Sequence, residues 1–269
     1  MANLRTISGH FLATNWSIIE AERQGFRFGA RGTHTSRTMM FDELSTVLTV
    51  TPSEGRREDY ALAIIESNCL GKPTVATRRL TNQRLGELYA LDPTVPLFRV
   101  LRQLWDLDPN SGRLLALQCA LARDPLLEAT APAIIALSIG SEFLREPMKT
   151  TLRLAVGDRL NDSILDKVIR NAASSWTQSG HLAGRTFKKR RAVAPTAMNA
   201  AYAVYLAHAS GFRGADIFAS AWLTVIDCSP SSGRELVLEA KRLGLLDLRI
   251  AGDVVELALD RLDPATARF

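Results

Sequence analysis

Cations gather most densely between positions 185 and 191, where Arg185, Lys188, Lys189, Arg190 and Arg191 stand within seven residues. Five such charges cannot be buried without partners, so they must be solvated or meet a polyanion. Neutralised phosphates release condensed counterions, so this cluster would supply an affinity for nucleic acid that falls steeply with salt. The alternative is an exposed loop that keeps the protein soluble. We favour nucleic acid because the cluster follows a helix and a turn.

The residues before the cluster carry the signals of one long helix. Asn161 or Asp162 can cap its start, and Gly180 can end it. Its apolar side chains recur at helical spacing in one stripe: Ile164, Val168, Ala172 and Trp176. Helix, turn and basic segment are the order of parts in a winged helix-turn-helix. The stripe is more apolar than a recognition helix needs, so we expect the helix to be scaffold and the segment beyond Gly184 to make the contact.

A second candidate lies earlier, where the turn LGKPT separates two predicted helices. The first helix is expected to run from about Arg57 to Gly71, and Thr74 is a plausible N-cap for the second. Arginines early in the second helix of such a pair are placed where a recognition helix meets bases and phosphates. A solvated helix face is an equally weighted alternative. The residues predicted to bind nucleic acid here are Lys72, Thr77, Arg78, Arg79 and Arg84. Of the two regions, this one holds the better candidate recognition helix.

Composition sets broad limits. The chain has 269 residues, 46% of them apolar and 23% charged, which is the balance of an ordinary globular protein. A net charge of +5 favours acidic partners such as nucleic acid, although the excess is modest. Cys69, Cys119 and Cys228 stand far apart in apolar contexts, which predicts free buried thiols in a reducing cytosol. No stretch of about 18 apolar residues exists, so we expect no membrane span and a cytoplasmic protein.

Signals of catalysis are weak. The adjacent carboxylates Asp42 and Glu43, and likewise Glu58 and Asp59, diverge on a helix and make poor acid–base pairs. GxSxG and HExxH motifs are absent from the sequence, and its four histidines form no cluster that would bind a metal. We therefore expect no catalytic residue, no cofactor and no metal.

The pattern of elements predicts an all-α protein, mostly a helical bundle with helix-turn-helix-like units, plus a small C-terminal β-hairpin. The hairpin comes from the β-prone runs LDLRI and VVELAL, joined by an Ala-Gly-Asp turn. Strands and helices do not alternate, which argues against a parallel nucleotide-binding sheet. We divide the chain into an irregular N-terminal extension (residues 1–35), an N-terminal helical domain (36–155) and a C-terminal helical, winged-helix-like domain (156–269).

Three blocks resemble BrxA proteins, components of BREX phage-defence systems: SNCLGKPTVATRRLTNQRLGELYALD, LLALQCALARDPLLEATAPAII and LNDSILDKVIRNAASSWTQSGHL. In the first block, the family's positions around its turn and its Thr-Arg-containing helix are held by Asn68, Leu70, Lys72, Thr77, Arg78 and Arg79. The block TSRTMMFDEL sits where the family often has a short apolar helix. The resemblance runs in order over roughly residues 36–260 and is one of pattern, without a catalytic motif.

The resemblance implies an all-helical, NusB-like fold and a non-catalytic accessory role in phage defence. It implies double-stranded DNA as partner, with other phage-defence proteins as further candidates. Two alternatives remain beside it. One is a helical scaffold that docks other proteins of a defence complex, and the other is an RNA-binding NusB-like protein.

Overall fold

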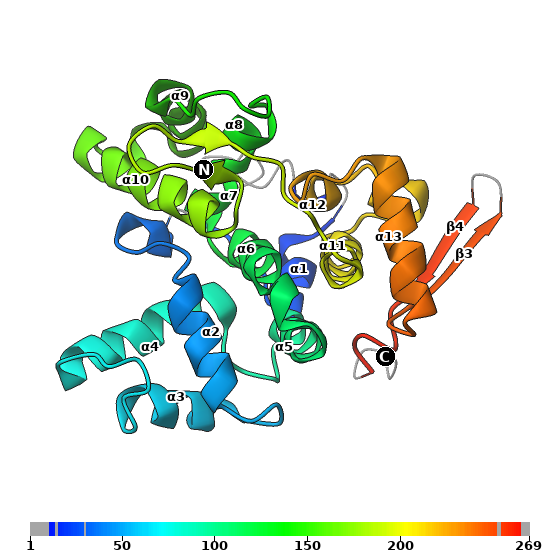
Figure 1. Cartoon of the computed structure of the whole chain (residues 1–269), viewed down its shortest axis with the longest axis horizontal. Coiled ribbons are helices and arrows are strands. Elements are labelled where there is room, and N and C mark those ends of the chain that lie inside the picture. Colours follow the sequence, from blue (N-terminus) through cyan, green and yellow to red (C-terminus); the bar gives the residue numbers. More distant parts are fainter. Residues whose placement is uncertain (1–10, 14–15, 30, 252–253, 265–269) are drawn as a thin grey trace.

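The computed structural model describes residues 11–13, 16–29, 31–251 and 254–264. It is mostly helical and ends in a small antiparallel hairpin, which confirms the predicted fold class (Figure 1). The helices of the first half are α1 (Ile18–Gln24), α2 (Phe41–Val50), α3 (Arg57–Ile65), α4 (Val75–Tyr89), α5 (Pro96–Leu107), α6 (Gly112–Arg123), α7 (Pro125–Glu128) and α8 (Ala131–Ile135), with 3-10 turns η2 (Thr33–Thr35) and η3 (Pro109–Ser111).

The second half contains helices, 3-10 turns and both hairpins. Its elements are α9 (Arg145–Val156), η4 (Gly157–Arg159), α10 (Asp162–Gln178), β1 (Leu182–Ala183), β2 (Lys189–Arg190), α11 (Ala197–Ala209), η5 (Gly214–Ile217), α12 (Ala221–Thr224), α13 (Pro230–Arg242), β3 (Asp247–Ala251) and β4 (Val254–Ala258). In Figure 1, α2, α3 and α4 lie at the lower left, α9 and α10 at the upper left, and α13 with the β3–β4 hairpin at the right.

Helix α6 lies in the middle of the molecule and carries the core (Figure 1). Every side chain from Leu114 to Ala122 is buried, as expected of an apolar helix covered on all sides. It packs against α2, α4, α5, α10 and α11. One cluster of buried apolar side chains therefore crosses the predicted boundary between residues 36–155 and 156–269, and the division into two domains stays a prediction.

The described part of residues 1–35, the predicted N-terminal extension, packs against the core. It contains α1, and the rings of Phe11 and Phe26 make T-shaped contacts with Trp222 at centroid distances of 4.7 and 5.7 Å. The Trp222 indole also donates a hydrogen bond to the Phe11 carbonyl at 3.0 Å. Aromatic rings bury large apolar areas, which explains why this segment folds inward. Residues 1–10, 14, 15 and 30 lie outside the described residues.

The helix boundaries follow local hydrogen bonding. Thr74 caps α4 by accepting from the Thr77 amide at 3.1 Å, and Asn161 caps α10 by accepting from Ile164 at 2.9 Å, as predicted. Helix α3 ends at Ile65, so the predicted end at Gly71 was wrong. Asn68, at φ 49°, reverses the chain first, because asparagine tolerates the left-handed region that closes a helix.

Two hairpins interrupt the helices. Strands β3 and β4 pair from Asp247↔Ala258 to Ala251↔Val254, where two strands were predicted; Gly252 and Asp253 of the predicted turn lie outside the described residues. Strands β1 and β2 follow α10 and pair as Leu182↔Arg190 and Ala183↔Lys189. Two-residue strands are too short for a periodic pattern to reveal.

Two sequence predictions concern the cysteines and membrane spans. The three cysteines are unpaired; Cys119 and Cys228 are buried as expected, whereas Cys69 is partly exposed. In the described part of the chain, no helix combines the length and apolarity needed to cross a membrane.

Candidate nucleic-acid interface

Residues 182–191 form a β-turn-β segment, which we call the basic hairpin. Gly184 makes its turn possible: at φ 113°, a Cβ there would lie 2.2 Å from the carbonyl oxygen of Phe187. Only glycine allows this close approach in the left-handed region. The turn therefore follows directly from one residue of the predicted basic segment.

The outer edge of the basic hairpin is also paired. The amides of Gly140 and Phe143 donate to the carbonyls of Arg190 and Lys188 at 2.8 and 2.7 Å, and the Arg190 amide donates to Ser141 at 2.9 Å. The segment between α8 and α9 thus acts as a third strand beside β2, with a bridge between Glu142 and Lys189. Pairing on both edges holds the backbone of β2 in one position.

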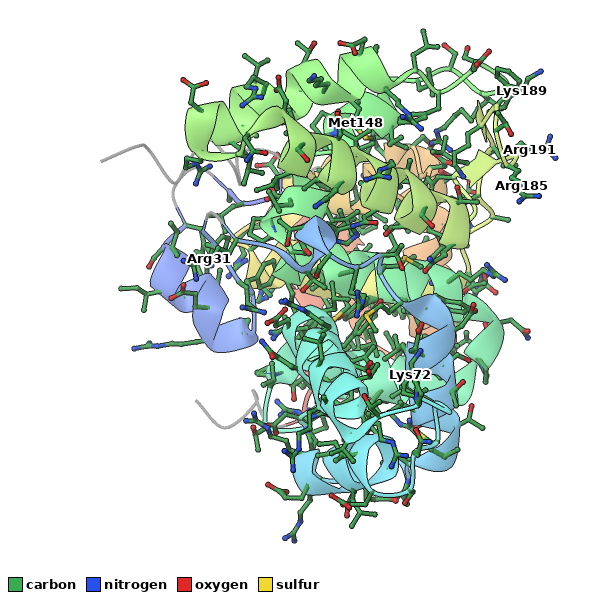
Figure 2. All side chains as sticks on the ribbon, turned by 90° about the vertical axis from the view of Figure 1, so that its left-hand side faces the viewer. Arg31, Lys72, Met148, Arg185, Lys189 and Arg191 are labelled. Carbon is green, nitrogen blue, oxygen red and sulfur yellow. The ribbon has the colours of Figure 1, made fainter. Side chains whose placement is uncertain are left out.

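Side chains alternate along this strand. Phe187, Lys189 and Arg191 are exposed, whereas Lys188 is half-buried and Arg190 is buried. This is the two-residue period of a β-strand, which sends successive side chains to opposite faces. Figure 2 shows Lys189 and Arg191 projecting with Arg185 at one edge of the molecule, opposite Arg31. The structure thus brings three of the five predicted cations together on an outward surface.

Arg190 departs from the expectation that all five cations meet solvent or a polyanion. The residue is 2% exposed, and its guanidinium forms an ion pair with Asp227. Its Nε donates to the Ile134 carbonyl at 3.2 Å, and Asp227 also accepts from the Val193 amide at 2.9 Å. The expectation was wrong because strand alternation turns this side chain inward, where a carboxylate distant in the sequence meets it. Arg190 anchors the basic hairpin and is not available to a ligand.

Lys188 connects the basic hairpin to α10. Its ammonium donates to the Thr177 hydroxyl at 2.7 Å and to the Gly184 carbonyl at 3.3 Å, and burial lowers the pKa of Lys188 from its usual value. Arg113 lies beside the same helix end: it donates to the Gln178 carbonyl at 2.8 Å and stacks over the Phe41 ring. Sequence analysis missed Arg113 because only tertiary packing brings the start of α6 to the end of α10.

His181 forms the floor of the basic hairpin. It is 1% exposed, and its Nε2 lies 2.7 Å from the Val225 carbonyl, which requires this nitrogen to donate. Its Nδ1 lies 2.9 Å from the Ser179 hydroxyl. Burial lowers the pKa of His181 to about 4, with the Arg190 charge acting in the same direction. The imidazole is therefore neutral at physiological pH and belongs to the support of the hairpin.

The other predicted cations lie on α4 and on the turn before it. We call α3, this turn and α4 the α3–α4 unit (residues 57–89). Arg78 closes this turn by donating to the carbonyls of Lys72 and Ile65, each at 3.2 Å. Lys72 pairs with Glu43 at 3.1 Å, and Arg84 pairs with Glu87 at 2.7 Å. Lys72 lies in the lower half of Figure 2, well below the labelled cations of the basic hairpin.

Arg79 is the exception in the α3–α4 unit. It is exposed, and within the described part of the chain it makes no side-chain hydrogen bond or ion pair. Thr77 is half-buried and shares a 2.9 Å hydroxyl contact with Thr74, so it completes the helix cap. The structure thus confirms a helix-turn-helix-like pair but leaves one of its predicted cations unengaged.

A buried trio has the hydrogen-bond order of a catalytic triad. His34 lies 2.8 Å from both Asp124 and the Ser175 hydroxyl, and all three side chains are at most 1% exposed. Ser175 also accepts from the Met39 amide at 2.8 Å and lies 2.9 Å from the Asn171 carbonyl. Burial favours a raised pKa for Asp124, but His34 and two backbone amides outweigh it and lower the pKa. No substrate reaches a hydroxyl so enclosed, and the trio ties η2 to α7 and α10.

The fold and the basic hairpin together define a helical protein with an outward surface suited to polyanions. Its cations stand on a backbone held by strand pairing and by one buried ion pair. A comparison of the sequence with models of protein families and with curated proteins finds no match.

Proposed function

We propose that this chain is a non-catalytic, cytoplasmic DNA-binding protein that contacts duplex DNA through the basic hairpin. One observation carries the proposal: Arg185, Lys189 and Arg191 are exposed on a hairpin whose strand β2 is paired on both edges, and within the described residues none of the three side chains forms an ion pair. Unpaired cations fixed in position lose little freedom when they meet phosphates, so they supply affinity efficiently.

The role in phage defence comes from the sequence. The blocks that resemble BrxA proteins include the turn and the second helix of the α3–α4 unit, and the resemblance implies an accessory role in a BREX-type system. In this proposal Arg79 supplies a secondary contact, while Lys72, Arg78 and Arg84 keep the unit folded. Lys188 within the basic hairpin and Arg113 at the neighbouring end of α10 add positive potential to this surface.

The test compares two triple variants that lose the same charge. One replaces Arg185, Lys189 and Arg191 by alanine. The control replaces three exposed arginines elsewhere: Arg31, Arg242 and Arg249. Affinity for a duplex is measured by mobility shift at about 50 and 200 mM salt, where each lost phosphate contact reduces the salt slope by about one unit.

We expect the hairpin variant to bind all duplex sequences more weakly and with a flatter salt slope than the control. Equal weakening by both variants, or no retardation of duplex DNA by the unmodified protein at low salt, would overturn the proposal. Stronger competition by RNA than by DNA would favour the NusB-like alternative. Retention of an acidic protein after nuclease treatment, without DNA affinity, would favour the scaffold.

A further inference from the structure

Phe187 stands at the tip of the basic hairpin with 71% of its surface exposed. Among the described residues it is the one aromatic side chain in the set of large exposed apolar groups, the others being aliphatic. Aromatic rings are usually buried because they carry much apolar area. An aromatic ring exposed at the tip of a hairpin is therefore a candidate contact for a binding partner.

Contacts of the neighbouring residues hold the backbone at Phe187 in place. The carbonyl oxygen of Phe187 lies so close to Gly184 that a Cβ at position 184 would be 2.2 Å from it. The turn is therefore closed tightly next to the ring. On the other side, Lys188 donates to both Gly184 and Thr177, which fastens the next residue to α10. Two residues further on, Arg190 is locked to Asp227. The ring is thus presented by a closed loop on a fixed base.

The neighbours of the ring indicate its partner. Arg185 precedes it by two residues and Lys189 follows it by two, and both are exposed. Phe187 lies in the bend just before β2, and a separation of two residues corresponds to roughly 7 Å along an extended backbone. A flat apolar surface bordered by anions matches this arrangement, and a base step between two phosphate backbones has that form. Proteins that kink DNA insert apolar side chains between bases in this way, with cations in the groove beside them.

We propose that Phe187 is a wedge that enters a base step of duplex DNA from the minor groove and bends the duplex. This inference rests on the proposed function, because the flanking cations must first bring the hairpin to DNA. Flexible pyrimidine–purine steps cost least to open, so the wedge favours TA steps over stiff A-tracts. The hairpin would thereby read the deformability of DNA without a hydrogen bond to a base edge.

The experiment uses the full chain with duplexes of about 30 base pairs that contain either one central TA step or an A-tract. Energy transfer between end labels reports bending, and 2-aminopurine at the central step reports unstacking. Phe187→Ala is compared with Phe187→Leu, which keeps an apolar side chain. Because Phe187 is exposed, both variants are expected to fold, and circular dichroism verifies this.

We expect the unmodified protein to bend the TA duplex and to raise 2-aminopurine fluorescence. Phe187→Ala should lose both signals and bind about tenfold more weakly, while its salt slope stays unchanged because the phosphate contacts remain. Phe187→Leu should keep part of the bend. Salt-dependent binding without bending or unstacking would overturn the wedge and leave the proposed function standing. Absence of all binding at low salt would overturn both.

Discussion

The α3–α4 unit and the basic hairpin are the two cation-rich regions of the chain, and they use their charges in opposite ways. In the α3–α4 unit all the predicted cations except Arg79 serve the fold: Arg78 binds two carbonyls, and Lys72 and Arg84 pair with carboxylates. In the basic hairpin one cation, Arg190, serves the fold, and those on the outer face remain unpaired. The hairpin is therefore the stronger candidate interface, in line with the expectation that the segment beyond Gly184 makes the contact, whereas the candidate recognition helix α4 offers one unengaged predicted cation, Arg79.

The two regions differ because acidic residues lie near the cations of one and not of the other. Glu87 follows Arg84 by three residues on one helix, so the two side chains meet without help from the rest of the fold. The basic hairpin contains no Asp or Glu between positions 182 and 191, so the cations of the hairpin pair only where tertiary structure supplies a carboxylate. Asp227 does so at the inward position of Arg190. A cation-rich run without nearby acids, and with alternate residues facing outward, is thus the more informative pattern.

The largest expected effect is the loss of stability caused by Arg190→Met. It tests whether the inward Arg190 differs in role from the outward cations beside it. Removing one partner of a buried ion pair leaves the other charge unpaired, and we expect a loss of about 3 kcal/mol in the free energy of unfolding. This is the lower end of the usual range because Asp227 keeps 20% of its side-chain surface exposed. Urea denaturation measures the change. Lys189→Met, one position away, should stay within about 0.5 kcal/mol. Equal losses would contradict the contrast between inward and outward cations.

The next effect is the dependence of stability on pH through His181. Burial lowers its pKa to about 4 in the folded chain, against an ordinary value of about 6.5 in the unfolded chain. The unfolded state therefore binds the proton first, and the stability contributed above about pH 6.5 is lost as the pH falls toward 4. Between pH 7 and 5 the loss is about 2 kcal/mol.

Comparing the protein with His181→Asn isolates this contribution, because carboxylates such as Asp124, whose pKa is lowered, also lose stability in acid. The variant should be less stable at pH 7, since it loses the contact to Val225. Its deficit should shrink by about 2 kcal/mol at pH 5. A deficit that stays constant across this range would show that His181 does not titrate against folding.

Sequence reasoning succeeded where structure depends on near neighbours. The caps Thr74 and Asn161, the inward position of Trp176 and the C-terminal hairpin all follow from periodicity or from hydrogen bonds within a few residues. It failed at the end of α3, where Asn68 reversed the chain before Gly71. Both residue types accept the left-handed region, and only the surrounding contacts decide between them.

The roles of the cations could not be predicted because their partners are distant in sequence. Asp227 stands 37 residues from Arg190, and Lys72 pairs with Glu43 across 29 residues. Arg113 reaches the end of α10 only because α6 and α10 pack together. A sequence shows how many charges a segment has, whereas folding decides which of them are left for a partner molecule.

A smaller effect distinguishes two adjacent arginines of the α3–α4 unit. Arg78→Ala removes two hydrogen bonds that close the turn, and we expect a loss of about 1 kcal/mol in stability with DNA affinity changed less than about twofold. Arg79→Ala should leave stability within about 0.5 kcal/mol and lower affinity modestly. Urea denaturation measures the stability of both variants, and mobility shift measures their DNA affinity. If Arg79→Ala weakened binding as much as the triple hairpin variant, the α3–α4 unit would be the principal interface.

The smallest effect concerns Glu142, which stands across from Lys189 on the segment paired with β2. Both side chains are exposed, so their attraction is weakened by water and salt and is worth little. Glu142→Gln should nevertheless raise DNA affinity about twofold at low salt, because it removes a negative charge beside the outward cations. Glu146→Gln, at the first turn of α9, makes the same charge change outside the paired segment and should have a smaller effect. Equal gains from both variants would mean that net charge, and not the surface of the basic hairpin, controls binding.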